Sequence, residues 1–287
     1  MFDWRLQPPA MALGSSEIVT AFSLALACAV LSVFVVSRRW AFIGEGISHS
    51  GFGGAGTVWL LSMFLPAVDR MRWAPYFGVV VFSLATAMAI AYFTRNGKIN
   101  SDAVIGIFLA ASLAWGILAQ QLYYRQLHRD PAGWNVFLFG HMGDISPQFA
   151  VAAAVLCAAV VASVILLGKE IVAYCFDPAI AEASGIHVGF IHYLLLMMIA
   201  MTIVIGVRVA GSVLVPAMLV LPGATALLVG KQLRFTVIAS MTVALLATIV
   251  GLSLNYRWHF LPTGPLIVLS LFVQFLCGYL WGKIVLR

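Results

Sequence analysis

Charged side chains are scarce in this chain. Only 9% of its 287 residues are Asp, Glu, Lys or Arg, whereas 63% are hydrophobic. Soluble domains carry about 25% charged residues, so the composition excludes a water-soluble globular protein. It predicts an all-α, polytopic integral membrane protein. The net charge of +6 does not indicate nucleic acid binding, because the basic residues lie in short connections, where they orient membrane helices.

Motifs for several other functions are absent from the sequence. The four cysteines are scattered without a Cys-x-x-Cys pair, which argues against a disulfide framework and against a thiolate metal cage. Gly168-Lys169 and Gly230-Lys231 lack the Ser or Thr that would complete a phosphate-binding loop, so the chain has no ATP site of that kind. There is no His-Glu-x-x-His or Gly-x-Ser-x-Gly motif. Energy for transport is therefore expected to come from a partner.

The spacing of other polar residues argues against an intramembrane enzyme. Ser48 and His49 are adjacent, so on a helix they point about 100° apart and do not form a nucleophile with its base. His187 and His192 are five residues apart and do not share one helical face, so we expect them at the membrane interface. The sequence thus predicts a protein that is not an enzyme.

Nine stretches of about 20 residues with little charge are candidates for membrane-spanning helices. They cover residues 16–37, 47–67, 73–93, 102–123, 148–168, 188–207, 210–229, 235–255 and 260–282. Small residues and proline are frequent in 47–67 and 210–229, so these two stretches are expected to be short, broken or tightly packed. A total of eight membrane-spanning helices is therefore the alternative to nine. We expect one transmembrane domain over residues 16–287, after an extracytoplasmic segment over residues 1–15.

The distribution of basic residues predicts the orientation. Lys and Arg follow the first, third, fifth, seventh and ninth stretches, which share one side if the spans alternate. That side is predicted to be cytoplasmic, with the N-terminus outside and the C-terminus inside. In the cytoplasmic connection 170–186, Asp177 fits a helix N-cap, Pro178 the first helical residue and Gly185 the stop. A short docking helix or a simple surface turn would satisfy this pattern.

An acid and a histidine stand four residues apart where little other charge occurs. Glu45 and His49 would lie one turn apart on one face of a helix, and Gly46–Val68 contains no Lys, Arg, Asp or Glu. Ionisable groups are costly in a membrane and mark substrate paths, and carboxylate and imidazole are ligands for divalent transition metals. The alternative is that Glu45 neutralises Arg38 or Arg39 while His49 packs inside the protein.

Two further groups are candidates for a metal path. His141 and Asp144, on the outer side, would guide incoming metal or else belong to a solvated loop. Met218 lies between Pro216 and Pro222, and prolines free backbone carbonyls that only protein or cavity water can satisfy. Met218 and Pro222 are therefore candidate pore residues, although the same region would also serve as a helix-packing surface.

Five motifs in order resemble those of one transporter family, over a region from about Ser16 to the C-terminus. They occupy residues 38–49, 101–107, 138–140, 176–186 and 209–226. The family is that of the membrane permease subunits of bacterial ABC importers for zinc, manganese and iron. The chain departs from the family pattern in having Glu45 where Asp is usual and Ala179 where the cytoplasmic loop usually has Glu.

The resemblance implies a homodimeric permease in the bacterial cytoplasmic membrane. Glu45 and His49 would bind a divalent metal, zinc or manganese, in transit. Two ATP-binding subunits would dock on the cytoplasmic helix, and an extracytoplasmic binding protein would deliver the metal. The residues expected to couple to the ATP-binding subunits are Asp177, Pro178, Ala181 and Gly185. Two alternative functions remain: a self-sufficient ion-coupled carrier or channel, and an ABC permease for iron chelates.

Overall fold

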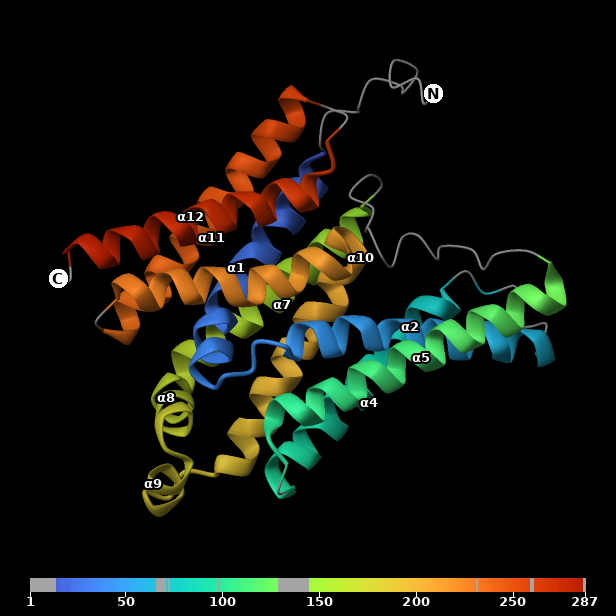
Figure 1. The fold of residues 1–287 in the computed structure, drawn as a ribbon, viewed down its shortest axis with the longest axis horizontal. Helices are drawn as coiled ribbons and strands as arrows, with labels where there is room; N and C mark the ends of the chain where they lie inside the picture. The colour runs from blue at the N-terminus through green and yellow to red at the C-terminus, as the bar shows by residue number, and fades with distance from the viewer. Residues whose placement is uncertain are drawn as a thin grey trace.

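A computed structural model describes residues 14–65, 71, 73–97, 99–128, 145–230, 232–258 and 261–285 (Figure 1). Every regular element in these ranges is a helix. The helices are α1 (Ser15–Ser37), α2 (Ile43–Phe64), α4 (Ala74–Asn96), α5 (Ser101–Leu127), α7 (Pro147–Leu166), α8 (Gly168–Phe176), α9 (Pro178–Ala183), α10 (Val188–Val229), α11 (Leu233–Arg257) and α12 (Thr263–Val285). The first 13 residues of the predicted segment 1–15 lie outside the described ranges, as do His141 and Asp144.

The all-helical membrane architecture is confirmed. Within the described residues, seven helical segments are long and apolar enough to cross a bilayer: α1, α4, α5, α7, the Val188–Val209 part of α10, α11 and α12. Helix α2, which carries Glu45, is not among the seven, and Leu214–Val229 forms only a shorter apolar helix. The predicted count of nine or eight spans thus stays a prediction.

Helix α10 joins two stretches that the sequence analysis separated. The predicted spans 188–207 and 210–229 run on as one element, Val188–Val229, which breaks at Gly211. Gly211 has φ 77° and ψ 170°, a conformation that is open to glycine because it has no Cβ. The element therefore consists of two helical halves with a sharp bend between them, and Pro216 and Pro222 both lie in the second half.

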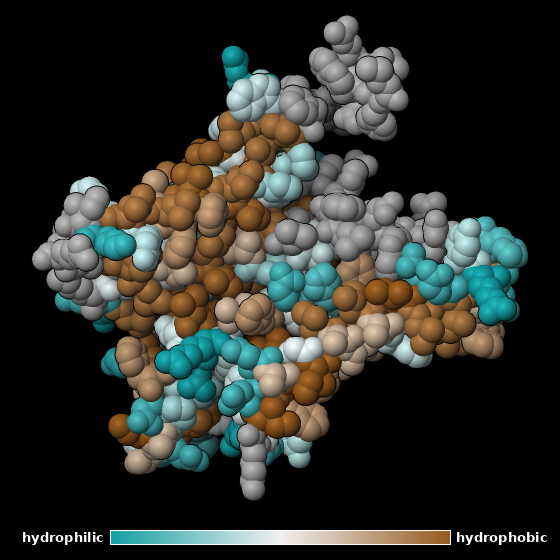
Figure 2. All heavy atoms as spheres, viewed as in Figure 1, coloured by the Kyte–Doolittle hydropathy of each residue, from teal (hydrophilic) through white to brown (hydrophobic). Residues whose placement is uncertain are grey.

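The helices form two groups that α10 connects. Helix α2 packs on α4 and α5 on one side of the molecule, while α1 packs on α7, α10 and α11 on the other (Figure 1). Buried apolar side chains such as Leu31, Phe34 and Leu195 fill the second group. Much of the outer surface is apolar too, and hydrophilic residues form smaller patches within it (Figure 2). Exposed apolar surface is expected here, because lipid is the solvent and helices associate by close packing.

Glycines allow the first group to pack closely. A Cβ at Gly54 in α2 would overlap the carbonyl oxygen of Gly78 in α4 and lie 2.8 Å from its carbonyl carbon. On the α5 side, a Cβ at Gly116 would lie 2.7 Å from the carbonyl carbon of Phe52. Both distances are too short for real Cβ contacts, so these backbones are in direct contact, as small residues allow between membrane helices.

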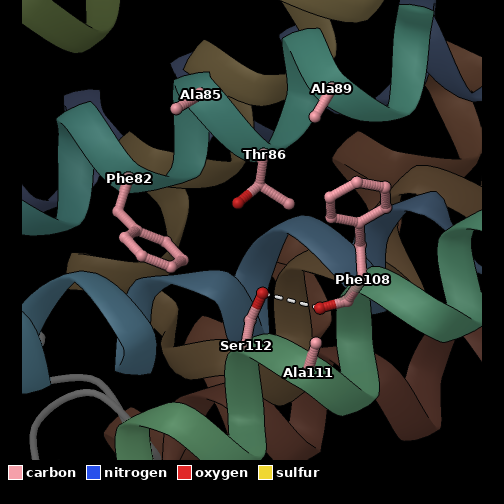
Figure 3. Close-up of a pocket in the computed structure, with 7 residues that line it drawn as sticks. All are labelled: Phe82, Ala85, Thr86, Ala89, Phe108, Ala111 and Ser112. Atoms are coloured by element: carbon pink, nitrogen blue, oxygen red, sulfur yellow. Dashed lines mark hydrogen bonds between the residues drawn. The ribbon is translucent and has the colours of Figure 1, made fainter. Parts of the chain in front are cut away.

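A groove of about 350 Å³ separates α4 from α5, which both pack on α2 (Figure 3). It is lined by Phe82, Ala85, Thr86, Ala89, Phe108, Ala111 and Ser112. The Ser112 hydroxyl donates to the carbonyl of Phe108 in its own helix at 2.6 Å. No ionisable side chain lines the groove, so it is not a candidate for metal binding.

Candidate metal site and docking helix

The turn before α2 determines where Glu45 and His49 lie. After α1 ends, Arg39 takes a left-handed conformation with φ 59°, and the Trp40 N–H donates to the Val35 carbonyl at 2.9 Å. Trp40 is only 2% exposed and anchors this reversal. Helix α2 then begins at Ile43, before the predicted start at residue 47. The acid and the histidine consequently fall in the first two turns, where the helix dipole favours a carboxylate.

Glu45 and His49 contact each other directly. Glu45 Oε2 lies 3.0 Å from His49 Nε2, and the His49 ring stacks on Phe52 with centroids 5.6 Å apart and an interplanar angle of 18°. A carboxylate only accepts hydrogen bonds, so Nε2 of the neutral ring carries the proton and Nδ1 carries the lone pair. His49 Nδ1 is buried and has no hydrogen-bond partner. The pair therefore combines a carboxylate with a buried imidazole nitrogen that has no hydrogen-bond partner.

Helix α2 packs against other helices of the chain on most of its sides. A Cβ at Gly44 would lie 2.9 Å from the Cα of Pro216 in α10, and one at Gly46 would lie 2.9 Å from a methyl carbon of Ile105 in α5. The Ser50 hydroxyl bonds that of Ser83 in α4 at 3.0 Å. The side that remains carries the pair, with the Glu45 side chain 40% exposed and that of His49 22% exposed. Both side chains are thus partly exposed, although His49 Nδ1 itself is buried.

Arginine does not neutralise Glu45 in the described part of the chain. The Arg38 guanidinium lies 4.4 Å from the centroid of the Tyr174 ring, and its Nη1 donates to the Tyr174 carbonyl at 3.4 Å. Among the described residues, the only acid–base contact is the one between Glu45 and His49. The alternative that Glu45 serves as a counter-ion for Arg38 or Arg39 therefore loses its support.

The described part of the chain supplies few metal ligands. Within the described ranges, no group of three or more His, Cys, Asp or Glu side chains comes together. The candidate pore residues lie inside the protomer, since Met218 is 2% exposed and Pro222 is buried. They do not share the exposed face of the pair. A fuller coordination shell would have to come from water, from backbone carbonyls or from a second chain.

A short helix is present in the connection 170–186, as α9, with the expected ends. The Asp177 carboxylate accepts from the N–H groups of Ala179 at 2.9 Å and Ile180 at 3.1 Å, which is N-cap geometry. Gly185 has φ 83°, and the N–H of the next residue, Ile186, bonds the Ala181 carbonyl at 3.1 Å. These bonds satisfy the free backbone groups at both ends, so a helix of six residues persists at the surface.

Helix α9 presents apolar side chains that sequence reasoning missed. Ala181 is 1% exposed and packs inward, whereas Ile180 is 66% exposed and Phe176, just before the cap, is 80% exposed. Phe176 and Ile180 are four residues apart and flank the Asp-Pro pair, which is the signal that would have identified them. Asp177, Pro178 and Gly185 thus shape the ends of the helix, while Ile180 on α9 and Phe176 at the end of α8 are exposed apolar side chains.

Comparison with known proteins identifies the family. The model of a family described as "ABC 3 transport family" matches residues 13–282. This chain belongs to the ABC 3 transport family. The resemblance found in the sequence motifs is therefore confirmed. Together with the seven apolar helices, this membership makes the chain a multi-pass transport permease of the cytoplasmic membrane.

Individual ABC 3 relatives match over nearly the whole chain. The "Probable iron transport system membrane protein" of Haemophilus influenzae is 28% identical over 287 residues, 100% of each chain. The manganese transport system membrane protein MntC of Listeria monocytogenes is 26% identical, over 92% of this chain and 89% of that protein. Among solved structures, PsaBC from Streptococcus pneumoniae in complex with Fab has 27% identity and a TM-score of 0.73, covering 92% of this chain and 90% of that one.

A buried hydrogen-bond network in this ABC 3 permease links α8, the helix before α9, to α4 and α10. His192 in α10 is 4% exposed, so its side chain packs inside the protein. Its Nε2 lies 2.9 Å from the Ala91 carbonyl of α4, and its Nδ1 lies 2.6 Å from the Tyr174 hydroxyl of α8. Since a carbonyl only accepts, Nε2 donates, and Tyr174 donates to Nδ1 of the neutral ring. One imidazole thus joins α4, α8 and α10.

We expect Tyr174→Phe to destabilise the protein by about 1–3 kcal/mol, because it leaves the buried Nδ1 of His192 without a donor. Burial raises the pKa of Tyr174 to about 12, against the opposing effect of Arg38. The folded state thus holds this proton more tightly than the unfolded state, whose tyrosine pKa is about 10. The protonated Tyr174 hydroxyl therefore contributes its full stabilisation below about pH 10, and this stabilisation is lost as the pH rises through about 12.

Thermal unfolding of the purified protein in detergent, measured from pH 7 to pH 11, tests this network. The gap in melting temperature between wild type and Tyr174→Phe should be constant at neutral pH and narrow above about pH 10. Tyr92→Phe is the matched control, since Tyr92 is 55% exposed. If Tyr174→Phe lowers the melting temperature no more than Tyr92→Phe does, the network does not stabilise the protein as proposed.

Proposed function

We propose that this chain is the permease subunit of an ABC importer that moves a divalent metal ion, zinc or manganese, or alternatively iron, across the cytoplasmic membrane. The observation that carries the proposal is the pair on α2. Glu45 and His49 are in contact at 3.0 Å, partly exposed, and not neutralised by a described arginine. Carboxylate and imidazole suit these metals. The names of relatives, which refer to manganese and iron transport, support the same class of cargo.

We further propose that the permease acts as a homodimer around one central path. Each chain offers one carboxylate and one imidazole on the side of α2 that its own helices leave uncovered, and two copies would double the ligands. Water or carbonyl oxygens would complete the shell. Binding would be weak, because a closed tetrahedral cage would trap the ion. In this dimer the metal is cargo, and no permanent cofactor or enzymatic activity is assigned to the chain.

The moving parts of the path are also proposed. Met218 and Pro222 are buried in the second half of α10, so they would line the path only after that half moves. The proposed topology has nine spans, with the N-terminus outside and the C-terminus inside. It places α9 in the cytoplasm, where two ATP-binding subunits would dock, and leaves the outer mouth to an extracytoplasmic metal-binding protein.

Metal uptake into vesicles tests the proposal against its rivals. Proteoliposomes that hold the permease with its ATP-binding subunit should accumulate manganese or zinc only when ATP and the binding protein are present. A self-sufficient carrier would move the same metal without ATP. An iron-chelate permease would transport the chelate and ignore free manganese or zinc. Either of these two outcomes would replace the proposed function.

The docking surface on α9 gives a direct prediction. Ile180→Asp should weaken co-purification of the ATP-binding subunit by about 30-fold, because a buried apolar anchor at an interface contributes about 2 kcal/mol. Leu127→Asp is the control, since Leu127 is 42% exposed and ends α5 on the proposed outer side. Equal recovery of the ATP-binding subunit with wild type and with Ile180→Asp would remove α9 from the interface.

A further inference from the structure

A large cavity opens between the ends of four helices, away from α2. Its volume is about 810 Å³. It is lined by Phe34 of α1, Val164 and Ile165 of α7, Gly168, Lys169, Val172 and Ala173 of α8, and Leu233, Arg234, Val237 and Ile238 of α11. Helix α8 lies directly below α7 (Figure 1). The cavity therefore lies where two spans end and a third begins, at the depth of a lipid headgroup region.

The charge of this cavity is entirely positive. Lys169 and Arg234 are its only ionisable lining residues, and neither forms an ion pair with a carboxylate in the described part of the chain. Glu170 follows Lys169 in sequence but is not among the lining residues. Helix α11 also begins here, with no side-chain cap at Gln232, so the partial positive charge of its first turn adds to that of the two cations.

The walls of the cavity are apolar and open sideways toward the membrane. Ile165 is 75% exposed and Ile238 is 59% exposed, so the rim next to the cations faces the lipid rather than the protein core. Two unpaired cations beside an apolar cleft form an amphipathic site. Basic pockets between membrane helices at the cytoplasmic face bind anionic lipid headgroups.

We propose that this cavity binds an anionic phospholipid of the cytoplasmic leaflet. Its phosphate would lie between Lys169 and Arg234, and its acyl chains would follow Val164, Ile165 and Ile238. The apolar walls favour a lipid over a free phosphate, which would use only the cations. The site is separate from the Glu45–His49 pair, so its test does not depend on the metal that the permease carries.

Native mass spectrometry of the full chain, released from detergent, tests the lipid site. The probes are phosphatidylglycerol and phosphatidylcholine with the same acyl chains. Wild type should retain phosphatidylglycerol in preference to phosphatidylcholine. Lys169→Gln with Arg234→Gln should weaken phosphatidylglycerol binding about 30-fold, and each single change about fivefold, because each cation near an anionic surface contributes a similar amount.

Two matched variants separate the site from general charge effects. Arg39→Gln with Lys283→Gln removes the same charge from exposed residues outside the cavity and should leave lipid retention within about twofold of wild type. Lys169→Arg with Arg234→Lys keeps both charges and should also retain the lipid. An equal loss in the Arg39/Lys283 variant would overturn the proposal.

Other occupants would give different results. Equal retention of phosphatidylcholine and phosphatidylglycerol would reduce the cavity to an unspecific apolar surface. Binding of glycerol phosphate as tightly as phosphatidylglycerol would make it a site for a soluble phosphate. Loss of a dimer peak in the Lys169/Arg234 variant would mean that a second copy of the chain covers the cavity. Each of these results would replace the lipid assignment.

Discussion

His49→Ala, like Glu45→Ala, should abolish metal uptake and leave the protein folded. The two side chains are the ionisable groups on the uncovered side of α2, and His49 Nδ1 has no other partner. Loss of a residue that merely orients a metal ligand lowers affinity about 10–100-fold, so loss of a ligand itself should lower uptake by at least about 100-fold. Stability should change by less than about 1.5 kcal/mol, because a partly exposed hydrogen bond contributes little.

Uptake of radioactive manganese or zinc into cells or proteoliposomes measures this effect, and size-exclusion chromatography checks that the protein is intact. His187→Ala is the control, because His187 is exposed and lies outside α2. Glu45→Gln keeps a hydrogen-bond acceptor for His49 but removes the charge, and it should fail like Glu45→Ala. Normal uptake by both alanine variants would take the pair out of the metal path.

Gly54→Val should prevent a stable assembly of α2 with α4. The new Cβ would overlap the backbone of Gly78, and backbone cannot move aside without separating the two helices. Overpacking of this kind costs about 1–3 kcal/mol, and direct backbone overlap places the change at or above the upper end. Because α2 carries the Glu45–His49 pair, metal uptake should be lost with the fold.

Gly106→Val in α5 is the matched control. A Cβ at Gly106 would meet no atom within 4 Å, so the same substitution in a neighbouring helix adds no clash. The melting temperature in detergent should fall sharply for Gly54→Val and stay near that of wild type for Gly106→Val. Equal melting temperatures for the two variants would show that the Gly54–Gly78 contact does not hold the helices together.

Local sequence signals predicted those features that depend only on neighbouring residues. The ends of α9 followed from Asp177, Pro178 and Gly185, because a cap, a proline and a left-handed glycine act within one turn. The contact between Glu45 and His49 followed from their spacing on one helical face. Their residue types and order also matched the family, which supplied the candidate role.

Features that depend on distant contacts were beyond the sequence pattern. The early start of α2 depends on Trp40, whose burial becomes visible only when the neighbouring helices are in place. His192 was expected at the interface because nothing near it in sequence indicates the hydroxyl of Tyr174, which reaches it from α8. The sequence placed the break between 188–207 and 210–229 at residues 208–209, whereas the structure bends at Gly211, since a break in hydropathy does not distinguish a loop from a kink.

The bend at Gly211 divides α10 into two halves that contact different parts of the protein. The first half of α10 holds His192, which is tied to Tyr174 just before α9. The second half holds Pro216 against the Gly44 backbone, next to Glu45. The connection from α9 to Glu45 thus runs through the Tyr174–His192 hydrogen bond, then along the two halves of α10 across Gly211, and finally through the packing of Pro216 on Gly44.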